Sequence, residues 1–481
     1  MNSNRLVLGI DIGTTAVKVA AFGVDGRLRG VHSVGYPIAR PRPGWAEQDP
    51  EDWWRGCTEA LEAVLAELEG EQIQAVGIVS QVNTHLLVDE HLRPLTEAVI
   101  WQDQRCAAVA RELDARFTPE DKRRIWGGPV ALDASFVGAR AAWFARERPE
   151  EWARARWILG PKDFIGARLT GRVATDKLAS VRVANQGGYL PEAVALVDGL
   201  GERLPELLEP EEVLGESAVV RAPVVVGTMD AFGAVFGTRT TEVGRGMISC
   251  GTSLVVAGAS RRKESARGVV SFPPRNGLTV HAGPTQAAGD AVRWWAQASG
   301  QSVAEVFAGA AGGGNRVVFT PYLQGERAPL WDADVRGSFL GLTSAATRAD
   351  LSRAVLTGVA FSARHVLEQV EEACGLRLPS LTFSGGGARS DLWTQLHADV
   401  LGRPIERLRV RDSAALGAAL LGAVGVGLQP DVETAAAAAV HVERVFEPQT
   451  DLTRWYEAYR ASYEGLAKVH ELLRDPGVMA E

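Results

Sequence analysis

Cysteine is scarce in this chain of 481 residues, and the four cysteines, Cys57, Cys106, Cys250 and Cys374, form no CxxC pair. A disulfide framework or a zinc site is therefore not expected, and a reducing compartment such as the cytoplasm fits. No apolar run approaches 18 residues, so no membrane span is expected. The opening "MNSNRLVLGID" has no basic segment followed by an apolar one, so no signal peptide is expected.

An excess of positive charge is also missing. The formal net charge is -8 and no block of basic residues occurs, so nucleic acid is not an expected partner. Hydrophobic residues make up 46% and charged residues 23%, as in ordinary globular proteins. The chain exceeds the roughly 250–300 residues at which single cores usually split, so more than one domain is expected.

The local patterns predict an α/β fold. Residues 5–34 are expected to form two or three strands, and residues 73–81 a short buried strand. Residues 51–69 carry apolar positions at helical spacing after an acidic start. Further expected elements are strands in 86–95 and 98–105, helices within 103–125, 138–156 and 348–373, and strand–turn–helix units at 223–236 and 381–393.

One pattern occurs twice. "IDIGTTAVKVAAF" near the start and "ISCGTSLVVAGAS" in the middle both read as a strand, a Gly-Thr turn and a second strand. Their threonines, Thr14 and Thr252, lie 238 residues apart, about half of the chain. A single repeat of that length indicates a duplicated domain, so we place a first domain at 1–244 and a second at 245–481.

The repeated turns suit phosphate. Backbone N–H groups and hydroxyls of Gly13, Thr14 and Thr15, and of Gly251, Thr252 and Ser253, can converge on phosphate oxygens without a basic side chain. The alternative for either turn alone is a simple connection between strands. Asp11 occurs only in the first copy, and a carboxylate beside a phosphate indicates a Mg²⁺ ion between them.

Each of two further glycine-containing turns allows both a structural and a functional interpretation. In "FSGGGARSDLW", Gly386 and Gly387 have no side chains, so a flat ring could lie on their backbone, but glycine loops between strand and helix are common. In "GTMDAFGAVFG", Asp230 follows a predicted buried strand, where it is either a helix cap or a general base.

Taken together, these segments resemble the FGGY family of carbohydrate kinases over essentially the whole chain, and within it the xylulose kinases. The matching segments, in the family's order, are "GIDIGTTAVKV", "WAEQDPEDWW", "SQVNTHLLVD", "VIWQDQRC", "GPKDFIGARLTG", "VGTMDAFGAVFG", "SCGTSLVV", "PYLQGERAPLWD", "GSFLGLT" and "FSGGGARSDLW". The resemblance implies two actin-like ATPase domains of the ribonuclease-H-like type with a central cleft. It also implies ATP-dependent phosphorylation of a sugar or polyol.

The resemblance assigns roles to individual residues. Asp230 matches the catalytic base, and Asp11 the acid that acts through the metal. The nucleotide-binding positions would be Gly13, Thr14, Thr15, Gly251, Thr252, Ser253, Gly289, Gly386, Gly387 and Arg389. The first domain would be the sugar-binding side and the second domain the nucleotide-binding side. The sugar-binding positions would be Gln81, Val82, Asn83, Trp101, Asp103 and Arg105.

The sugar is less well determined than the chemistry, because three motifs around the pocket depart from the xylulose kinases. Asn83 replaces a histidine of a Gln-Met-His-Gly motif, Gln102 and Gln104 alter an Asn-Asp-Gly-Arg motif, and Ala231 follows the base. D-xylulose is the expected substrate, with ribulose, erythritol or xylitol as alternatives, and a nucleotide- and sugar-binding regulator without transfer activity as a further one. Contact of His85 or Trp45 with the sugar, and a homodimer, are left open.

Overall fold

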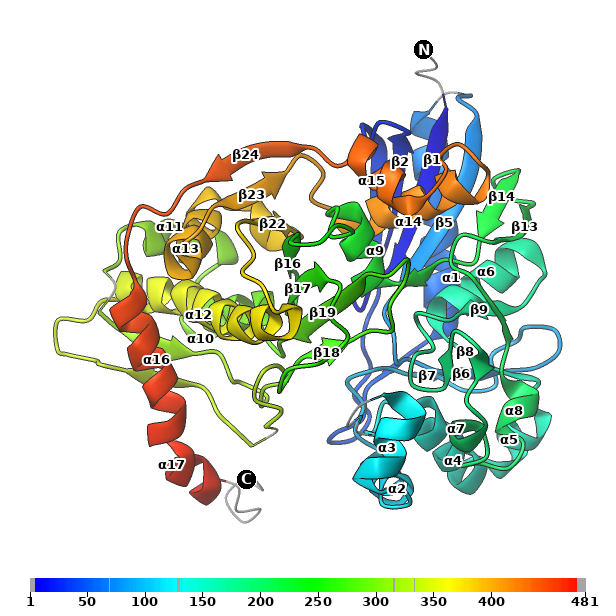
Figure 1. The fold of residues 1–481 in the computed structure, drawn as a ribbon, viewed down its shortest axis with the longest axis horizontal. Helices are drawn as coiled ribbons and strands as arrows, with labels where there is room; N and C mark the ends of the chain where they lie inside the picture. The colour runs from blue at the N-terminus through cyan, green and yellow to red at the C-terminus, as the bar shows by residue number, and fades with distance from the viewer. Residues whose placement is uncertain are drawn as a thin grey trace. The chain divides into compact units, whose positions relative to one another are not determined.

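The computed structural model describes residues 5–68, 70–127, 130, 132–314, 316–332 and 334–473. The chain forms two compact units: unit 1 contains Met1–Gly237 and Ser413–Ala439, and unit 2 contains Thr238–Asp412 and Val440–Glu481. Each unit has its own β-sheet flanked by helices (Figure 1). The units differ from the predicted division at 244/245, since 413–439 pack with the first unit. The sugar and nucleotide roles of the two domains stay a prediction.

The sheet of unit 1 runs in the order β13-β14-β5-β1-β2-β3, and β15 also pairs with β5. β5 is parallel to β1, β14 and β15, whereas β1, β2 and β3 form an antiparallel meander. These strands are β1 (Leu6–Ile12), β2 (Ala16–Gly23), β3 (Leu28–Gly35), β5 (Ile73–Ser80), β13 (Val213–Ser217), β14 (Ala222–Val225) and β15 (Thr228–Met229). β1 and β5 are almost wholly buried apolar runs, which is typical of strands covered on both faces.

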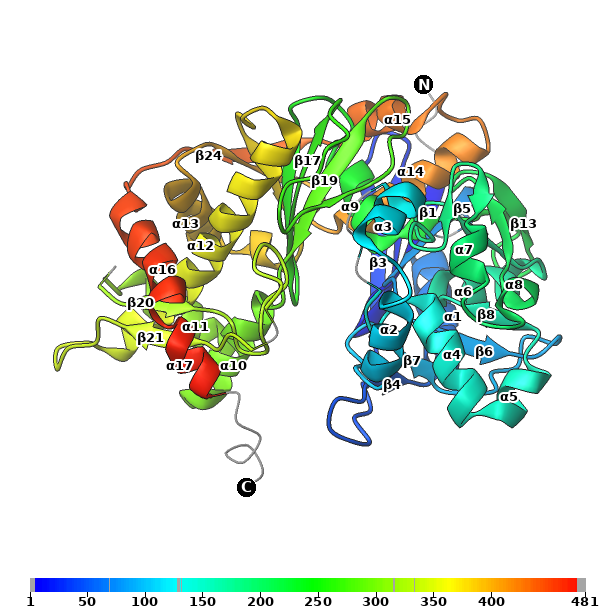
Figure 2. The ribbon, with the colours of Figure 1, turned by 60° about the horizontal axis from the view of Figure 1, so that its bottom comes forward.

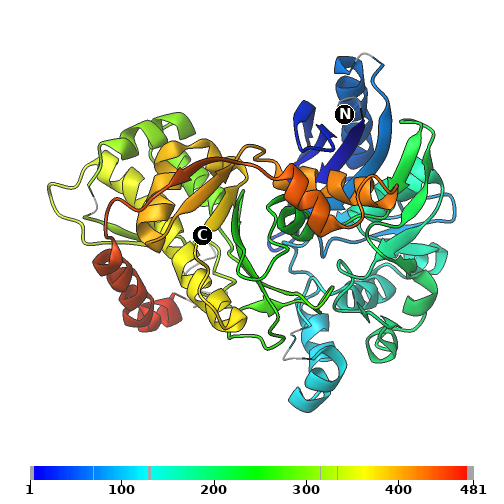
Figure 3. The ribbon, with the colours of Figure 1, turned by 45° about the horizontal axis from the view of Figure 1, so that its top comes forward.

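Helices cover the sheet of unit 1. α1 (Pro50–Glu67) lies against β2 and β3, and α6 (Pro161–Thr170) against β5 and β13. α14 (Ser413–Gly425) lies against β1 and β5, and α9 (Asp230–Gly237) packs on α14. α15 (Val432–Ala439) follows α14. Figure 3 shows the orange α14 and α15 beside the blue N-terminal strands, although about 400 residues of sequence separate them.

Glycines permit this close packing of α14. A Cβ atom on Gly417 would lie 1.9 Å from the carbonyl oxygen of Gly233 in α9, and one on Gly9 would lie 1.8 Å from the carbonyl oxygen of Ala415. Both neighbours are backbone atoms, so they cannot move aside as a flexible side chain would. The two helices and the strand can therefore pack at this distance only without side chains.

We expect Gly417→Ala to lower the free energy of unfolding by about 1–3 kcal/mol or more, because the added methyl group overpacks a backbone contact. Gly56→Ala is the matched control in α1 of the same unit, since its Cβ would lie 3.6 Å from Val34, an ordinary contact. The control should be neutral or stabilising by up to about 1 kcal/mol. Urea denaturation of both variants checks this, and equal midpoints for the two would contradict it.

A second apolar core of unit 1 lies beyond the sheet. It joins residues of β6, β7 and β8 to surrounding helices, as Figure 2 shows for α4, α5, α7 and α8. The elements of this region are β4 (Glu47–Gln48), β6 (Leu86–Val88), β7 (Ala98–Val99), α2 (Ala107–Asp114), α3 (Pro119–Trp126), α4 (Val137–Glu147), α5 (Pro149–Arg154), β8 (Trp157–Leu159), β9 (Ala174–Asp176), β10 (Ala184–Asn185), β11 (Gly188–Tyr189), α7 (Pro191–Val194), α8 (Leu200–Arg203) and β12 (Glu206–Leu208).

The sheet of unit 2 runs in the order β18-β19-β17-β16-β22-β23-β24. The long helix α12 lies against β17 and β19, and α13 against β23 and β24. The elements are β16 (Gly246–Cys250), β17 (Leu254–Ser260), β18 (Val270–Ser271), β19 (Thr279–Pro284), α10 (Gly289–Ala298), α11 (Val303–Ala311), β20 (Val318–Thr320), β21 (Ser338–Leu340), α12 (Arg348–Cys374), β22 (Leu381–Ser384), the 3₁₀ helix η1 (Gly386–Arg389), α13 (Asp391–Leu401), β23 (Ile405–Leu408), β24 (Val442–Phe446), α16 (Thr453–Gly465) and α17 (Ala467–Leu472).

Both predicted Gly-Thr hairpins are confirmed, but their loops differ in length. In unit 1, Ile12 pairs with Val17, which leaves four residues in the turn. In unit 2, Cys250 pairs with Leu254, which leaves three. In the described part of the chain, no helix is both long and apolar enough to cross a lipid bilayer.

Candidate functional site

Three predicted site residues meet at the carboxyl edge of the sheet of unit 1. The last residues of β1, β5 and β15 pair in one row, with β1 and β15 on either side of β5. The next residues along these strands therefore come together: Gly13, Gln81 and Asp230. The Gln81 N–H continues the ladder by donating to the carbonyl oxygen of Ile12 at 2.9 Å. Carboxyl ends of parallel strands are where ligands bind in open α/β sheets.

The carbonyl groups of the first turn are held from outside it. The Gly13 carbonyl accepts hydrogen bonds from the Tyr36 hydroxyl and from Nε2 of Gln81 at 3.4 Å. The Thr14 carbonyl accepts from Nε2 of the buried Gln48 at 2.6 Å. Nε2 of Gln81 also donates to Oε1 of Gln48 at 2.8 Å, so the two amide side chains brace each other under the turn.

The turn at Gly251 is held in a similar way in unit 2. N–H groups at the start of α10 donate to the Gly251 carbonyl at 3.0 Å and to the Thr252 carbonyl at 2.9 and 3.1 Å. In both turns, the described residues supply no acceptor for the N–H groups of the two residues that follow the glycine. Fixed carbonyl groups and available N–H groups are the features of an anion-binding nest.

Asp11 lies on β1, two residues before the first turn, directly opposite Lys18 of β2. Burial raises the pKa of the nearby Tyr36 hydroxyl well above its usual value, and the negative charge of Asp11 raises it further. Within the described residues, no three His, Cys, Asp or Glu side chains gather as they would around a metal held by protein alone. Mg²⁺ in nucleotide sites takes one or two protein carboxylates and completes its shell with phosphates and water, so a single carboxylate beside a turn with available N–H groups fits that ion.

Trp101 links the first Gly-Thr turn to the predicted sugar-binding segment. Its indole Nε1 donates to Oγ1 of Thr14 at 3.0 Å, and its backbone N–H donates to Oγ1 of Thr84 at 3.2 Å. That threonine hydroxyl donates in turn to Oε1 of Gln81 at 3.3 Å. The ring is half-buried, and its role in sugar binding stays a prediction.

Asp103 requires a correction, because it is fully buried and its oxygens are engaged. They accept from the Ala46 N–H at 2.6 Å and from Nε and Nη2 of Arg105 at 2.7–2.9 Å. Arg105 itself pairs with Glu47 at 2.7 Å and stacks on the Trp45 ring at 3.6 Å. Direct sugar contact by Asp103 does not fit this burial. The Asp103–Arg105 pair instead positions the loop that carries Trp101.

Val82 and Asn83 follow Gln81 in the predicted sugar-binding segment, and both are half-buried. Asn83 has a left-handed backbone with φ of 59°, a conformation that asparagine tolerates better than most residues. Its Oδ1 accepts a hydrogen bond from Nη2 of Arg182 at 2.8 Å. The side chain at this departure from the xylulose kinases is thus fixed by an arginine 99 residues further along the chain.

The glycines predicted to bind the nucleotide differ in whether packing requires the absence of a side chain. A Cβ on Gly387 would lie 2.7 Å from the Cys250 Sγ, so this residue is required by packing against β16. A Cβ on Gly386 would meet no atom within 4 Å, so this residue is open and exposed, as is Arg389. A Cβ on Gly289 would lie 2.6 Å from the Gly251 carbonyl oxygen, so glycine is required for α10 to pack against the second Gly-Thr turn.

Glu326 is a buried carboxyl that stabilises the loop before α10 in unit 2. It is buried, and its Oε1 accepts from the N–H groups of Gln286 at 2.5 Å and Arg327 at 2.8 Å. Burial raises the pKa of this carboxyl to about 7, against the opposing effect of those two hydrogen bonds. Gln286 precedes Gly289 by three residues, so the carboxyl holds the loop that leads into α10.

The raised pKa of Glu326 predicts a pH dependence of stability. Between the ordinary value of 4.5 and about 7, the folded state binds the proton more tightly than the unfolded state. Stability therefore falls as the pH rises through this range, by about 3 kcal/mol in total. Glu326→Gln should remove this loss. Urea midpoints at pH 5 and pH 8 test it, and the same pH slope in both proteins would contradict it.

Sequence reasoning missed Gln48 and Arg182. Gln48 lies in the segment "WAEQDPEDWW", which the resemblance matched, so its position in a family segment was an available signal. Arg182 had no such signal, because nothing in the sequence connects "ASVRVAN" to Asn83. Arg140 is fully buried and donates to the Ile100 carbonyl at 2.9 Å, a purely structural contact.

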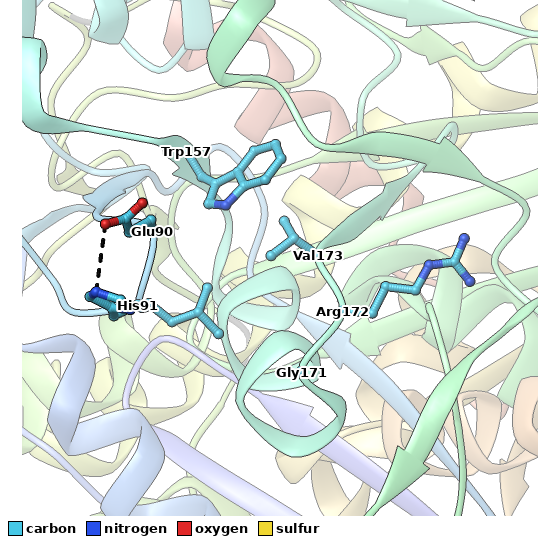
Figure 4. A pocket seen from close by; sticks show the side chains of 7 residues that line it. Glu90, His91, Trp157, Gly171, Arg172 and Val173 are labelled. Carbon is cyan, nitrogen blue, oxygen red and sulfur yellow. Dashed lines mark ion pairs between the residues drawn. The ribbon is translucent and has the colours of Figure 1, made fainter.

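A separate pocket lies on the surface of unit 1, and Figure 4 shows its lining residues: Glu90, His91, Leu92, Trp157, Gly171, Arg172 and Val173. It contains none of the predicted site residues. Glu90 and His91 face each other at 3.6 Å, and both are exposed. The pocket therefore does not belong to the site at the strand ends.

Comparisons with known proteins identify the family. Residues 6–237 match the N-terminal domain, and residues 246–426 the C-terminal domain, of the FGGY family of carbohydrate kinases. A xylulose kinase of Escherichia coli is 31% identical over 87% of this chain and 90% of its own, and a glycerol kinase of Thermococcus gammatolerans is 29% identical over 96% of both. The crystal structure of a xylulose kinase from Brucella ovis has a TM-score of 0.84 at 30% identity, covering 96% of this chain and 100% of that one. The predicted resemblance and fold class are confirmed.

Proposed function

Because this chain belongs to the FGGY family of carbohydrate kinases, we propose that it phosphorylates a hydroxyl group of a ketopentose, with D-xylulose as the favoured substrate and xylulose 5-phosphate as the product. The chain is a sugar kinase, a phosphotransferase with an alcohol group as acceptor, and kinases of its family use ATP. The observation that carries the proposal is the row of Gly13, Gln81 and Asp230, which sets a carboxylate beside a turn with available N–H groups.

Asp230 is proposed as the general base. It is the first residue of α9, and its Oδ1 accepts the N–H of Ala231 at 2.7 Å, so the side chain is held at the helix start. In this proposal the carboxylate accepts the proton of the sugar hydroxyl as the hydroxyl oxygen attacks phosphorus. Phosphoryl transfer passes through a loose transition state, so positioning and charge neutralisation matter more than a strong base.

The two Gly-Thr turns are proposed to hold phosphate oxygens. Each presents two N–H groups from a backbone whose carbonyl groups are already fixed, so no reorganisation is needed when the phosphate binds. Asp11 is proposed to hold Mg²⁺, which when bound neutralises charge on the phosphates. Gly386, with open space beside its backbone, is the proposed platform for the nucleotide base, with Arg389 nearby.

The acceptor sugar is proposed to lie against Gln81, Val82, Asn83 and Trp101. The relatives at comparable identity include glycerol kinases as well as xylulose kinases, so the acceptor test must span polyols. ADP release should be measured with D-xylulose, D-ribulose, erythritol, xylitol and glycerol. We expect the highest kcat/KM for D-xylulose. A higher value for a polyol would replace the substrate assignment, and no acceptor-dependent ADP release would overturn the kinase proposal for this chain.

A further inference from the structure

Arg182 is held rigidly beside Asn83 in unit 1. Its Nη2 donates to Oδ1 of Asn83 at 2.8 Å and to Oγ of Ser135 at 2.9 Å, and its Nη1 donates to Oδ1 of Asp133 at 2.9 Å. The Phe136 ring lies 5.7 Å from its guanidinium carbon. Two segments of the chain, one at Asn83 and one at residues 133–136, therefore fix one guanidinium group.

The partners of Arg182 are themselves fixed. Oδ1 of Asp133 also accepts from the N–H and the hydroxyl of Ser135 at 2.8 and 2.7 Å. Burial alone would raise the pKa of Asp133, but the charge of Arg182 and these hydrogen bonds outweigh it and lower the pKa to about 2. The ion pair is therefore complete at neutral pH. The Arg182 backbone is held as well, because its carbonyl accepts from the Trp126 indole at 2.9 Å.

Two nitrogen atoms near Asn83, one of Arg182 and one of His85, have no hydrogen-bond partner among the described residues. The hydrogen bonds of the Arg182 guanidinium all use Nη1 or Nη2. Among the described residues, none accepts a hydrogen bond from its Nε. His85, two residues after Asn83, has a buried Nδ1 with no hydrogen-bond partner in the described part of the chain. Burial lowers the pKa of His85 well below its usual value, and the charges of Arg140 and Arg182 lower it further, so the ring is neutral.

The charges around this place balance. Arg182 is paired with Asp133, Arg105 with Glu47, and Arg140 lies 3.4 Å from Asp103. Each cation has a carboxylate partner, so no surplus positive charge is left for a carboxylated sugar. The remaining N–H groups suit oxygens of an uncharged molecule, such as hydroxyl or carbonyl groups.

We propose that Arg182 determines acceptor specificity by donating a guanidinium N–H to a carbonyl or hydroxyl oxygen of an uncharged ketose bound beside Asn83. This inference rests on the proposed function, since it places the sugar at Asn83. A rigid donor favours a substrate with an oxygen at the matching position and rejects one that leaves the donor unpaired.

The test compares wild type with Arg182→Met in steady-state kinetics on D-xylulose and xylitol, which differ by the carbonyl group. For the variant we expect KM for D-xylulose to rise about 10–100-fold with kcat changed less than about threefold, and the preference over xylitol to shrink. Arg172→Met is the matched control, because Arg172 is a paired arginine of the same unit that contacts Glu206 at 2.8 Å. It should leave both constants unchanged.

Two further variants separate contact from support. If Arg182 acted only by fixing Asn83, Arg182→Met would have no further effect in an Asn83→Ala background, and that result would overturn the proposal. A continuing rise in KM in that background supports it. Arg182→Lys keeps the charge but loses the planar fork, so we expect a folded protein whose KM for D-xylulose is raised. Wild type that turns over no sugar would refute the proposed function, whereas active wild type with unchanged KM in both Arg182 variants would refute this inference alone.

Discussion

We expect Asp230→Asn to lower kcat by about 10²–10⁴-fold while KM for the acceptor changes much less. Asparagine keeps the size of the side chain and can still accept the Ala231 N–H at the start of α9. It cannot take up a proton from the attacking hydroxyl. The loss should therefore appear in the chemical step, and ADP release at saturating sugar and ATP measures it.

Asp431→Asn is the matched control for this prediction. Asp431 lies directly before a helix of unit 1, α15, where its Oδ1 accepts the Thr434 N–H at 2.7 Å, and it is exposed. Both substitutions remove one carboxylate at a helix start, and each should change the free energy of unfolding by about 1 kcal/mol or less. Only Asp230→Asn should lose turnover. If that variant kept more than a tenth of wild-type kcat, Asp230 would be a helix cap and not the base.

The two hairpins illustrate what a local pattern can predict. Strand, glycine turn and strand follow from apolar residues around Gly-Thr, and both hairpins form as predicted. The lengths of the turns could not be predicted, because register depends on distant partners. Ala16 pairs with Gly35 of β3, whereas the first paired residue of β17 opposite β19 is Val255, which meets Pro284. The neighbouring strand, not the turn sequence, sets where each hairpin closes.

The position of α14 shows a second limit. It is a helix of small apolar residues in the second half of the chain, and most of them are buried. Its place against β1 and β5 of unit 1 depends on contacts with Gly9 and Gly77, about 400 and 340 residues away. Each glycine alone looks like a flexible point in a strand. Only the structure shows that both glycines are required for the same reason, which is the close contact of each with the backbone of α14.

At the site, the residue types were predictable but their accessibility was not. The sequence patterns pointed to Gly13, Gln81 and Asp230, and the structure brings these three residues to one edge because the parallel strands before them end there. The pattern could not tell that the lone pairs of Asp103 are taken by the Ala46 N–H and Arg105. The sequence of a polar motif does not distinguish a carboxylate that faces the substrate from one that stabilises the loop behind the site.

The second large effect is expected from Lys162→Met, which breaks a buried ion cluster. Nζ of Lys162 lies 2.6 Å from Asp163 and 3.0 Å from Asp176, and all three side chains are at most 8% exposed. Without the ammonium group, two buried carboxylates face each other with no counter-charge. We expect the free energy of unfolding at pH 7–8 to fall by about 3–5 kcal/mol. Urea denaturation measures this loss.

The sign of the pH dependence provides an independent check. Burial already raises the pKa of Asp163 despite Lys162, and removal of the lysine should raise it further. A carboxyl whose pKa is raised by folding costs stability as the pH rises through that range. The deficit of Lys162→Met should therefore be smaller at pH 5 than at pH 8. Lys122→Met, which breaks the less buried pair with Asp114, should cost at most about 1 kcal/mol at either pH.

The same cluster supports the strand that leads to the proposed base. Oδ2 of Asp176 accepts the Thr228 hydroxyl at 2.7 Å, and Thr228 begins β15, two residues before Asp230. The Lys162 N–H donates to Oγ of Ser80, the last residue of β5, at 3.3 Å. Folded Lys162→Met should therefore also lose kcat, because the two strand ends that set Asp230 beside Gln81 lose a shared support. A variant with wild-type stability and turnover would show that this cluster supports neither the fold nor the site.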